Sequence, residues 1–346
     1  MKVLMLGTYN IKGYSRGRIL YKGLQKNNAD VDIYLCRKWT KYFDIARRVL
    51  RNDYDIIIAT GKFVLLVSKL LKAFHRKPIV FDAFISDYDN LVNDRKTVEK
   101  NSGKAWMLWK GDKYACLLSD LVLLDTNNHI NYFVEEFGLK RNKFRRVFIG
   151  ADEEIFYPRK AHKSKEFVVS FHGTFIPLQG IEYIVKAAKI LEKEKIKFEI
   201  VGAGQTYNEI KELCKKLKIK NIDFLGFKKL ETLPGYISRG DVCLGIFGAS
   251  EKTQRVIPNK AYEIIAMEKP LITGDTPAIK ELFSHKKNCY LCNAADERSL
   301  ADAIMALKKD AGLRKKIASG GNALFEEKCS AVEMGKTLKQ YLAGLQ

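Results

Sequence analysis

The stretch GIFGASEKTQRVIPNKAYEIIAMEKPLIT gathers three cations and a carboxylate around one predicted loop-to-helix junction. Lys252, Arg255 and Lys260 are the cations, and Asn259 is placed to cap the helix whose first turn carries Lys260. Backbone N–H groups, the helix dipole and the cations would then converge on one anion, and a diphosphate suits such a site. One turn further on, Glu263 can accept hydrogen bonds from both hydroxyls of a ribose. A solvated cationic loop before an ordinary core helix is the alternative interpretation.

Two glycine-containing turns follow predicted strands elsewhere in the second half of the chain. In VGAGQT, Gly202 and Gly204 lie between a strand and a helix, where glycines let a backbone approach a phosphate. The third glycine of a dinucleotide fingerprint is missing, because Tyr207 stands there. HGTFIPLQG begins at His172 and also follows a strand, at the edge where open α/β sheets bind ligands. Tight turns without a ligand are the alternative for both segments, and a satisfied buried side chain is the simpler role for His172.

Carboxylates are concentrated in the first half of the chain in VFDAFISDYDNLVNDR, where Asp82 directly follows a predicted strand. This polar density is unusual for a simple connection, although loops are generally polar. DxD triplets, which can hold a divalent ion through sugar phosphates, begin at Asp30, Asp53 and Asp87. The first two lie beside strands at ordinary turns. We therefore expect no metal site.

The elements that would position these residues alternate along the whole chain. Short apolar runs predict strands, and longer amphipathic stretches between them predict helices. The predicted strands are 3–6, 31–35, 55–59, 79–81, 121–124 and 147–149, and then 167–171, 198–201, 222–225, 242–246 and 271–273. Helices are predicted at 42–50 and 63–74, and by apolar stripes at helical spacing over 210–217 and 300–307. The expected fold class is α/β, with Rossmann-like domains built on parallel sheets.

A chain of 346 residues exceeds what one hydrophobic core usually supports, so two domains are expected. The polar segment GADEEIFYPRKAHKSK has no apolar periodicity and separates the two sets of strands. We place an N-terminal domain at 1–155, a C-terminal domain at 156–328, and a terminal helix at 329–346 that packs back toward the first domain. MKVLML followed by Gly7 indicates a first strand rather than a secretory signal, and no run of 18 apolar residues predicts a membrane span.

The formal net charge of +21 is spread evenly, with 28 Lys and Arg against 18 Asp and Glu in residues 1–155, and 33 against 22 in the rest. Such an excess fits an anionic partner: nucleic acid, an acidic membrane surface or a phosphorylated small substrate. The 7 cysteines are dispersed, which indicates reduced thiols in a reducing compartment. Cys289 and Cys292 form a CxxC without a second pair, so core packing is favoured over metal or redox chemistry.

The second half of the chain resembles the family 4 glycosyltransferases. The similarity runs through GTFIPLQGIEYIVKAAKIL, FEIVGAGQ, IDFLGFKKLETLPGYISRGDVCLGIF and NKAYEIIAMEKPLITGDTPAIKELF, and it covers about the last half of the chain. The first half matches more loosely, best at VFIGADEEIFYP. The resemblance implies the GT-B fold, in which two Rossmann-like domains face each other across a cleft. It also implies retaining transfer of a sugar from a nucleotide-diphosphate donor, of the UDP or GDP type, without a metal or other cofactor.

The same resemblance assigns roles to individual residues. Glu263 takes the place of the second glutamate of the family's paired motif and would bind the donor ribose, while Phe227 stands where the family contacts the base. The donor-binding residues expected in total are Gly7, Gly173, Thr174, Gln179, Gly202, Gly204, Phe227, Lys252, Asn259 and Glu263.

This sequence departs from the family pattern around the phosphates. Thr174 and Gln179 replace the usual arginine and lysine clamp, Arg255 replaces the first glutamate, and Asp82 is the nearest residue to the usual histidine of the first domain. Arg255 and Lys260 would supply the missing positive charge from a neighbouring loop and stabilise the leaving phosphate. The catalytic residues expected are therefore Asp82, Arg255 and Lys260.

Other functions fit parts of the sequence. The altered clamp also suits a catalytically silent, sugar-nucleotide-binding subunit of a glycosyltransferase complex. A nicotinamide oxidoreductase is suggested by Gly-Ala-Gly alone, and a nucleic-acid binder lacks interleaved aromatic and basic residues. For the favoured activity we expect a glycan, a lipid-linked molecule or another hydroxyl compound as acceptor, in the synthesis of cell-envelope polysaccharide.

We expect a cytoplasmic location with reversible contact to an anionic inner membrane face. The segment FVLLVSKLLKAF and its lysines are followed by His75, Arg76 and Lys77. Each such cation near an anionic leaflet contributes about 1 kcal/mol. The alternative for this segment is a crossover helix buried against the first sheet.

Overall fold

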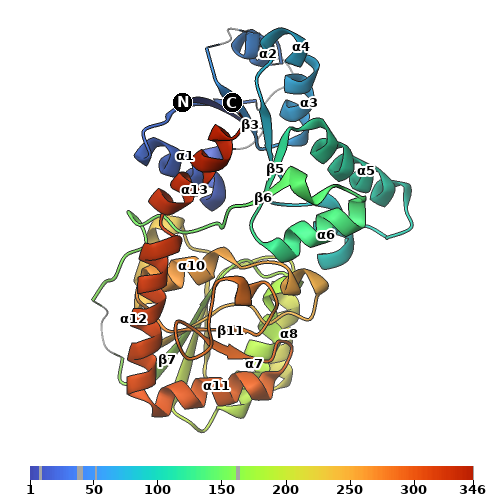
Figure 1. Ribbon diagram of the computed structural model, residues 1–346. Coiled ribbons are helices and arrows are strands. Elements are labelled where there is room, and N and C mark those ends of the chain that lie inside the picture. The colour runs from blue at the N-terminus through green and yellow to red at the C-terminus, as the bar shows by residue number, and fades with distance from the viewer. Residues whose placement is uncertain (8–9, 37–41, 51–52, 161–163, 346) are drawn as a thin grey trace. The chain divides into compact units, whose positions relative to one another are not determined.

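The computed structural model describes residues 1–7, 10–36, 42–50, 53–160 and 164–345. These residues form two compact units, each built on its own parallel sheet (Figure 1). The first unit comprises Met1–Gly150 together with Cys329–Gln346, and the second comprises Ala151–Lys328. The α/β fold class predicted from the alternating pattern is confirmed.

The first unit contains a six-stranded sheet in the order β2-β1-β3-β4-β5-β6. Its strands are β1 (Lys2–Gly7), β2 (Asp30–Leu35), β3 (Ile56–Ala59), β4 (Ile79–Asp82), β5 (Leu121–Leu124) and β6 (Phe144–Arg146). Its helices are α1 (Ser15–Lys26), α2 (Tyr42–Leu50), α3 (Lys62–Leu70), α4 (Lys72–His75), α5 (Gly103–Leu118), α6 (Asn127–Phe137) and α13 (Ala331–Ala343). Helix α13 packs on α1, where Lys339 Nζ donates to the carbonyl of Asn27 at 2.6 Å.

Two predictions for this unit were wrong in their boundaries. The last strand is Phe144–Arg146 rather than 147–149, because Phe144 is the residue that pairs with Val122 of β5 and fills the core. The residues at 147–149 are buried but lie beyond the ladder. The helix expected over 63–74 is divided at Leu71 into α3 and α4.

The second unit contains a six-stranded sheet in the order β12-β11-β10-β7-β8-β9. Its strands are β7 (Phe167–His172), β8 (Ile196–Val201), β9 (Ile222–Gly226), β10 (Val242–Leu244), β11 (Leu271–Gly274) and β12 (Tyr290–Cys292). Its helices are α7 (Ile181–Ile190), α8 (Tyr207–Lys216), α9 (Leu233–Arg239), α10 (Asn259–Ala266), α11 (Glu297–Lys309) and α12 (Ala311–Lys328). Strand β12, which is three residues long and ends in the CxxC, was not predicted from the sequence.

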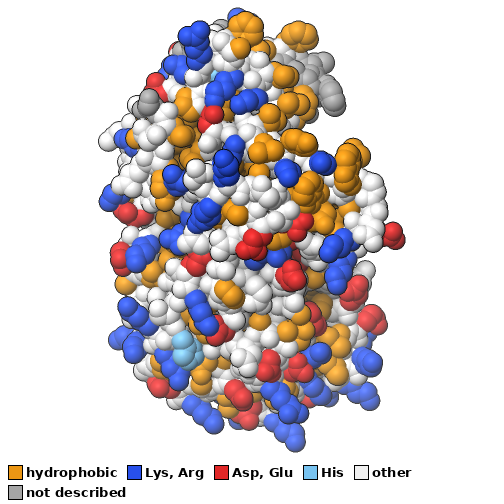
Figure 2. All heavy atoms as spheres, turned by 45° about the vertical axis from the view of Figure 1, so that its right-hand side comes forward, with side chains coloured by type: hydrophobic (Ala, Val, Ile, Leu, Met, Phe, Trp, Pro, Cys, Tyr) orange, Lys and Arg blue, Asp and Glu red, His pale blue; other side chains and the backbone are white. Residues whose placement is uncertain are grey.

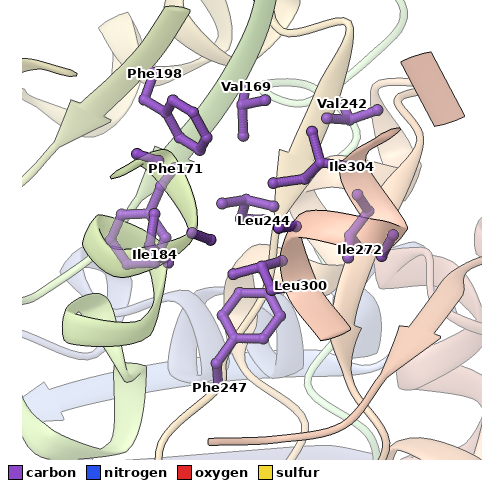
Figure 3. Close-up of a cluster of buried hydrophobic side chains, with 14 of the residues drawn as sticks. Val169, Phe171, Ile184, Phe198, Val242, Leu244, Phe247, Ile272, Leu300 and Ile304 are labelled. Carbon is purple, nitrogen blue, oxygen red and sulfur yellow. The ribbon is translucent and has the colours of Figure 1, made fainter. Parts of the chain in front are cut away.

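The core of the second unit lies between this sheet and helices α7 and α11 (Figure 3). Val169 and Phe171 of β7 lie in it with Leu244 of β10, and helix α11 adds Leu300 and Ile304. Successive side chains of a strand point to opposite faces, so His172 leaves this core and lies on the other face, where it meets α10. Cys289 and Cys292 are buried, and burial raises the pKa of both thiols to about 12. These cysteines pack in the interior.

Because all strands within each sheet are parallel, the turns that leave their carboxyl ends meet at one edge. In the second unit this edge carries the turns after β7, β8, β9 and β10, and helix α10 starts near it. These are the segments to which the sequence analysis assigned donor-binding residues.

Candidate functional site

A buried histidine–glutamate pair joins β7 to α10. His172 Nε2 donates to Oε2 of Glu263 over 2.8 Å, and both side chains are almost fully buried. His172 is the last residue of β7, while Glu263 lies one turn inside α10. The structure thus orients the proposed ribose-binding carboxylate through a partner that the sequence analysis had treated only as a buried side chain.

Lys260 is buried in the first turn of α10. Its Nζ donates to Gln179 Oε1 over 2.5 Å and lies 3.5 Å from the centroid of the Phe171 ring. Burial lowers the pKa of Lys260 well below the ordinary lysine value, and the negative charge of Glu263 opposes this shift only in part. A cation held in this way is costly to bury, because an ammonium has three donors to satisfy.

Gly173 leaves no room for a side chain beside this lysine. A Cβ atom at Gly173 would lie 2.7 Å from Lys260 Nζ, and its φ of +156° belongs to the region that favours glycine. A Cβ at Gly202 would lie 1.9 Å from the Gly173 carbonyl oxygen, so the turns after β7 and β8 pack backbone to backbone. Gly204 lies in the same turn, against the Phe175 backbone. Packing alone therefore explains these glycines, and a ligand at the edge is compatible with it.

The other expected donor-binding residues of this unit lie on neighbouring turns. Thr174 is exposed after Gly173, and Phe227 follows Gly226 at the end of β9 with 77% of its surface exposed. Lys252 belongs to the 3₁₀ helix η7 (Glu251–Gln254), and Arg255 follows it.

Arg255 pairs with a nearby carboxylate, and Asn259 lies inside α10 rather than at its cap. Nη1 of Arg255 donates to Oε2 of exposed Glu251 over 3.4 Å. The expectation that Asn259 caps α10 is wrong, because the helix already begins at Asn259. Extended Pro258 occupies the N-cap position, and no side chain caps this end. The structure therefore brings Gly173, Gln179, Lys260 and Glu263 together around His172.

Asp82 of the first unit forms a buried ion pair at the end of β4. Arg16 of α1 donates through Nε to Asp82 Oδ1 over 2.7 Å, and through Nη1 to the carbonyl of Val147 over 2.8 Å. Both charged side chains are 2% exposed. Burial raises the pKa of Asp82, while the Arg16 charge acts in the opposite direction. Gly7, at the end of β1, lies against Thr60 and Ile11.

A second buried pair lies at the end of the neighbouring strand. His129 of α6 donates through Nδ1 to Asp125 Oδ1 over 2.7 Å, and both residues are buried. Asp125 adds to the rise in the pKa of Asp82, so the two pairs interact electrostatically. Neither this pair nor Arg16 was predicted from the sequence. Asp125 and His129 are four residues apart across the start of α6, and this spacing would have indicated the Asp125–His129 pair.

The DxD triplets pair with cations. Asp32 accepts from Arg48 over 2.6 Å, Asp53 lies 3.5 Å from the Lys2 ammonium, and Asp87 is 2.7 Å from that of Lys62. Within the described residues, no group of three or more His, Cys, Asp and Glu is arranged to hold a metal ion.

Comparison with known proteins shows what the second unit and the fold are similar to. Residues 152–323 match the family described as glycosyl transferases group 1. These residues make up nearly the whole second unit. Together with the relatives below, the match shows that the second unit is similar to group 1 glycosyl transferases, and the chain has the GT-B fold.

The curated relatives are distant glycosyltransferases. Over 174 residues the chain is 26% identical to the uncharacterized glycosyltransferase MJ1607 of Methanocaldococcus jannaschii, covering 48% of this chain and 42% of that protein. It is 24% identical over 157 residues to the lipopolysaccharide core biosynthesis glycosyltransferase LpsD of Rhizobium meliloti, covering 45% and 43%. These alignments span less than half of either relative. The capsular polysaccharide biosynthesis glycosyltransferase CapM of Staphylococcus aureus matches along 91% of this chain and 90% of its own, at 20% identity.

Solved structures share the fold over the full chain. Anabaena Alr3699/HepE in complex with UDP superposes with a TM-score of 0.75 at 16% identity, covering 100% of both chains. Sucrose-phosphate synthase from Thermosynechococcus elongatus superposes with a TM-score of 0.74 at 16% identity, covering 99% of this chain and 100% of its own. At this level of identity the superpositions establish the fold alone.

Proposed function

We propose that the chain transfers a sugar from a nucleoside-diphosphate donor to a hydroxyl group of an acceptor. One observation carries the proposal: Lys260 and Glu263 are both buried in the first turns of α10 and reach the glycine turn after β7. A buried cation beside a buried carboxylate matches the phosphate and ribose groups of one nucleotide. The structures of HepE in complex with UDP and with UDP-glucose support a donor of this kind.

Each part of the donor has a candidate partner. Glu263, oriented by His172, would accept from the two ribose hydroxyls. Exposed Phe227 offers an apolar ring to the base. Lys260 would bind the diphosphate, with Lys252 and Arg255 on the preceding segment as further cations.

The chemistry proposed is retaining glycosyl transfer. The bond between the anomeric carbon and the diphosphate oxygen breaks, and a bond from the same carbon to the acceptor oxygen forms. Fixed cations would stabilise the charge that develops on the leaving diphosphate, so that no divalent ion is required. The catalytic role predicted for Asp82 of the first unit stays a prediction, and its carboxylate is held in place by Arg16. The sugar is proposed to be a hexose or a close relative.

The acceptor proposed is a glycan or lipid-linked intermediate of cell-envelope polysaccharide. The names of LpsD and CapM, which concern lipopolysaccharide core and capsular polysaccharide, support this class. A catalytically silent nucleotide-binding subunit is the second candidate. It is favoured by exposed Thr174 and neutral Gln179, where the family resemblance implies an arginine and a lysine.

Donor binding and hydrolysis test the proposal and separate the two candidates. Nucleotides and nucleotide sugars are screened by thermal shift, and a ligand at 100 times its dissociation constant should stabilise the chain by about 2.7 kcal/mol. The donor that binds is then incubated with the protein, with and without chelator. Slow release of nucleoside diphosphate that chelator does not change supports the enzyme. Binding without any release supports the silent subunit, and no stabilisation by any nucleotide overturns both.

We also propose that helices α3 to α5 contact an anionic membrane. No described helix is both long and apolar enough to cross a bilayer. Large apolar side chains are nevertheless exposed on this surface among cations (Figure 2): Leu66, Leu70, Phe74, Trp106, Met107, Tyr114 and Leu117. Lys110 Nζ lies 5.5 Å from the Trp106 ring centroid, an arrangement of aromatic ring and cation that suits a lipid interface.

Co-sedimentation with vesicles tests this contact. We expect binding to vesicles that contain anionic lipid, release at high ionic strength, and little binding to neutral vesicles. Replacing Lys104 and Lys110 by Glu should weaken binding roughly 30-fold or more, because each cation contributes about 1 kcal/mol. The matched control replaces exposed Lys315 and Lys316 of α12 by Glu. Equal loss in both double variants, or equal binding to both vesicle types, would reject this surface as the contact.

A further inference from the structure

The side chains of Lys260 and Gln179 are in contact although the two residues are distant in the chain. Lys260 comes from the first turn of α10, and Gln179 from the 3₁₀ helix η5 (Pro177–Gln179) that follows β7. Their side chains meet over 2.5 Å and both are buried. Because the two polar tips are in contact, exchanging the residue types would leave a cation at nearly the same place.

The cation in this pair is only partly satisfied. Within the described residues, Gln179 Oε1 is the acceptor within hydrogen-bonding distance of Nζ, and the Phe171 ring covers another side. An ammonium has three N–H donors, so at least one has no oxygen partner. The Gly173 backbone lies directly beside Nζ, since even a Cβ there would come within 2.7 Å. An anion that approaches the turn at Gly173 would supply the missing acceptors.

The surroundings also set the proton affinity of this amine. The side chains that contact Lys260 are Phe171 of β7 and Gln179 of η5. The charge that acts on its pKa is that of Glu263 on α10, which is hydrogen-bonded to His172 of β7. Gln179 on η5 is neutral, and Arg255 precedes α10. Burial lowers the pKa of Lys260, and an added phosphate would raise it again. Without an anion, therefore, the amine holds its proton less tightly than an ordinary lysine does.

We propose that Lys260 and Gln179 form a proton-linked anion site, in which Lys260 takes up a proton as the diphosphate of the donor binds beside Gly173. This inference rests on the proposed function, because it assigns the diphosphate-binding cation of the same site. The proposal also explains how the site keeps a cation although residue 179 is neutral: Lys260 of α10 places its ammonium beside Gln179. Proton uptake is expected between the pKa of Lys260 in the free protein and its higher pKa in the complex.

Calorimetry of the unaltered chain tests the proton uptake. UDP or GDP, whichever binds, is titrated above pH 7.5 in buffers of different ionisation enthalpy, where the phosphate itself is fully ionised. Binding enthalpy that changes with the buffer in the direction of proton uptake supports the inference, and the Lys260→Met variant should lose that dependence. A nucleoside diphosphate that binds without proton uptake would overturn it while leaving the proposed function standing. Failure of every nucleoside diphosphate to bind would overturn both.

A charge exchange tests the location of the cation. Lys260→Gln should weaken binding of the nucleoside diphosphate about 10- to 100-fold and leave the matching nucleoside nearly unchanged. Gln179→Lys should not improve binding, because it places two amines in contact. Combining the two changes should restore most of the affinity for the diphosphate, which a purely structural pair would not do. Equal losses for nucleoside and nucleoside diphosphate in Lys260→Gln would contradict the assignment.

Discussion

Replacing Glu263 by Gln is expected to weaken binding of the donor nucleotide about 10- to 100-fold, which corresponds to about 1.5 to 3 kcal/mol for hydrogen bonds to a charged group. The carboxylate offers acceptors to two ribose hydroxyls, whereas a carboxamide keeps one acceptor and presents a donor instead. The glutamine oxygen can still accept from His172, so the contact between β7 and α10 is retained. Titration calorimetry measures the change, and thermal unfolding shows that the fold persists.

Two controls make this result specific. Binding of a 2′,3′-dideoxynucleoside diphosphate should be the same for the unaltered chain and for Glu263→Gln, since the hydroxyls that the carboxylate accepts are absent. Glu268→Gln, at an exposed position just beyond the end of α10, should leave affinity unchanged. If Glu263→Gln weakens the dideoxy compound as much as the natural one, the carboxylate does not bind the ribose.

Replacing Arg16 by Met should destabilise the first unit by about 3 to 5 kcal/mol, because it leaves a buried carboxylate without its partner. Asp82 and Arg16 are each 2% exposed, so water cannot replace the lost contact. Without the arginine, whose charge lowers the pKa of Asp82, that pKa should rise further above the unfolded value. When the pKa of a carboxyl group is higher in the folded than in the unfolded protein, the protein loses stability as the pH rises through the folded-state pKa. The loss should therefore be largest at neutral pH and shrink toward acid pH.

Denaturant unfolding at several pH values measures this effect. Arg48→Met is the matched control, because the Arg48–Asp32 pair has a similar distance of 2.6 Å but is substantially exposed, and such pairs contribute about 1 kcal/mol or less. Changing both residues in Arg16→Met with Asp82→Leu should recover much of the stability, since no unpaired charge remains. If Arg16→Met and Arg48→Met lose similar amounts of unfolding free energy, the buried Arg16–Asp82 pair stabilises the protein no more than an exposed pair does.

Predictions from the sequence agree best with the structure for elements whose type follows from the residue pattern within a single segment. Leu300, Ala303, Ile304 and Leu307 recur at helical spacing, and all four are buried in α11. Short elements were harder. Strand β12 has only three residues, too few to show a period, and β6 was shifted because the apolar residues beside it are equally buried. The predicted cap of α10 was wrong by one residue, because Pro258 and Asn259 are both common at helix starts.

The candidate site, too, could be predicted from the sequence only in part. Residue type and local spacing in the sequence indicated a cationic helix start with a carboxylate one turn on, and a family of enzymes that uses such a start. They could not reveal that Lys260 meets Gln179, that His172 orients Glu263, or that Arg16 pairs with Asp82. Each of these contacts joins residues separated by 66 to 91 positions, so no local period encodes it. Only the parallel sheets, which bring the carboxyl ends of successive strands to one edge, place these side chains within hydrogen-bonding distance.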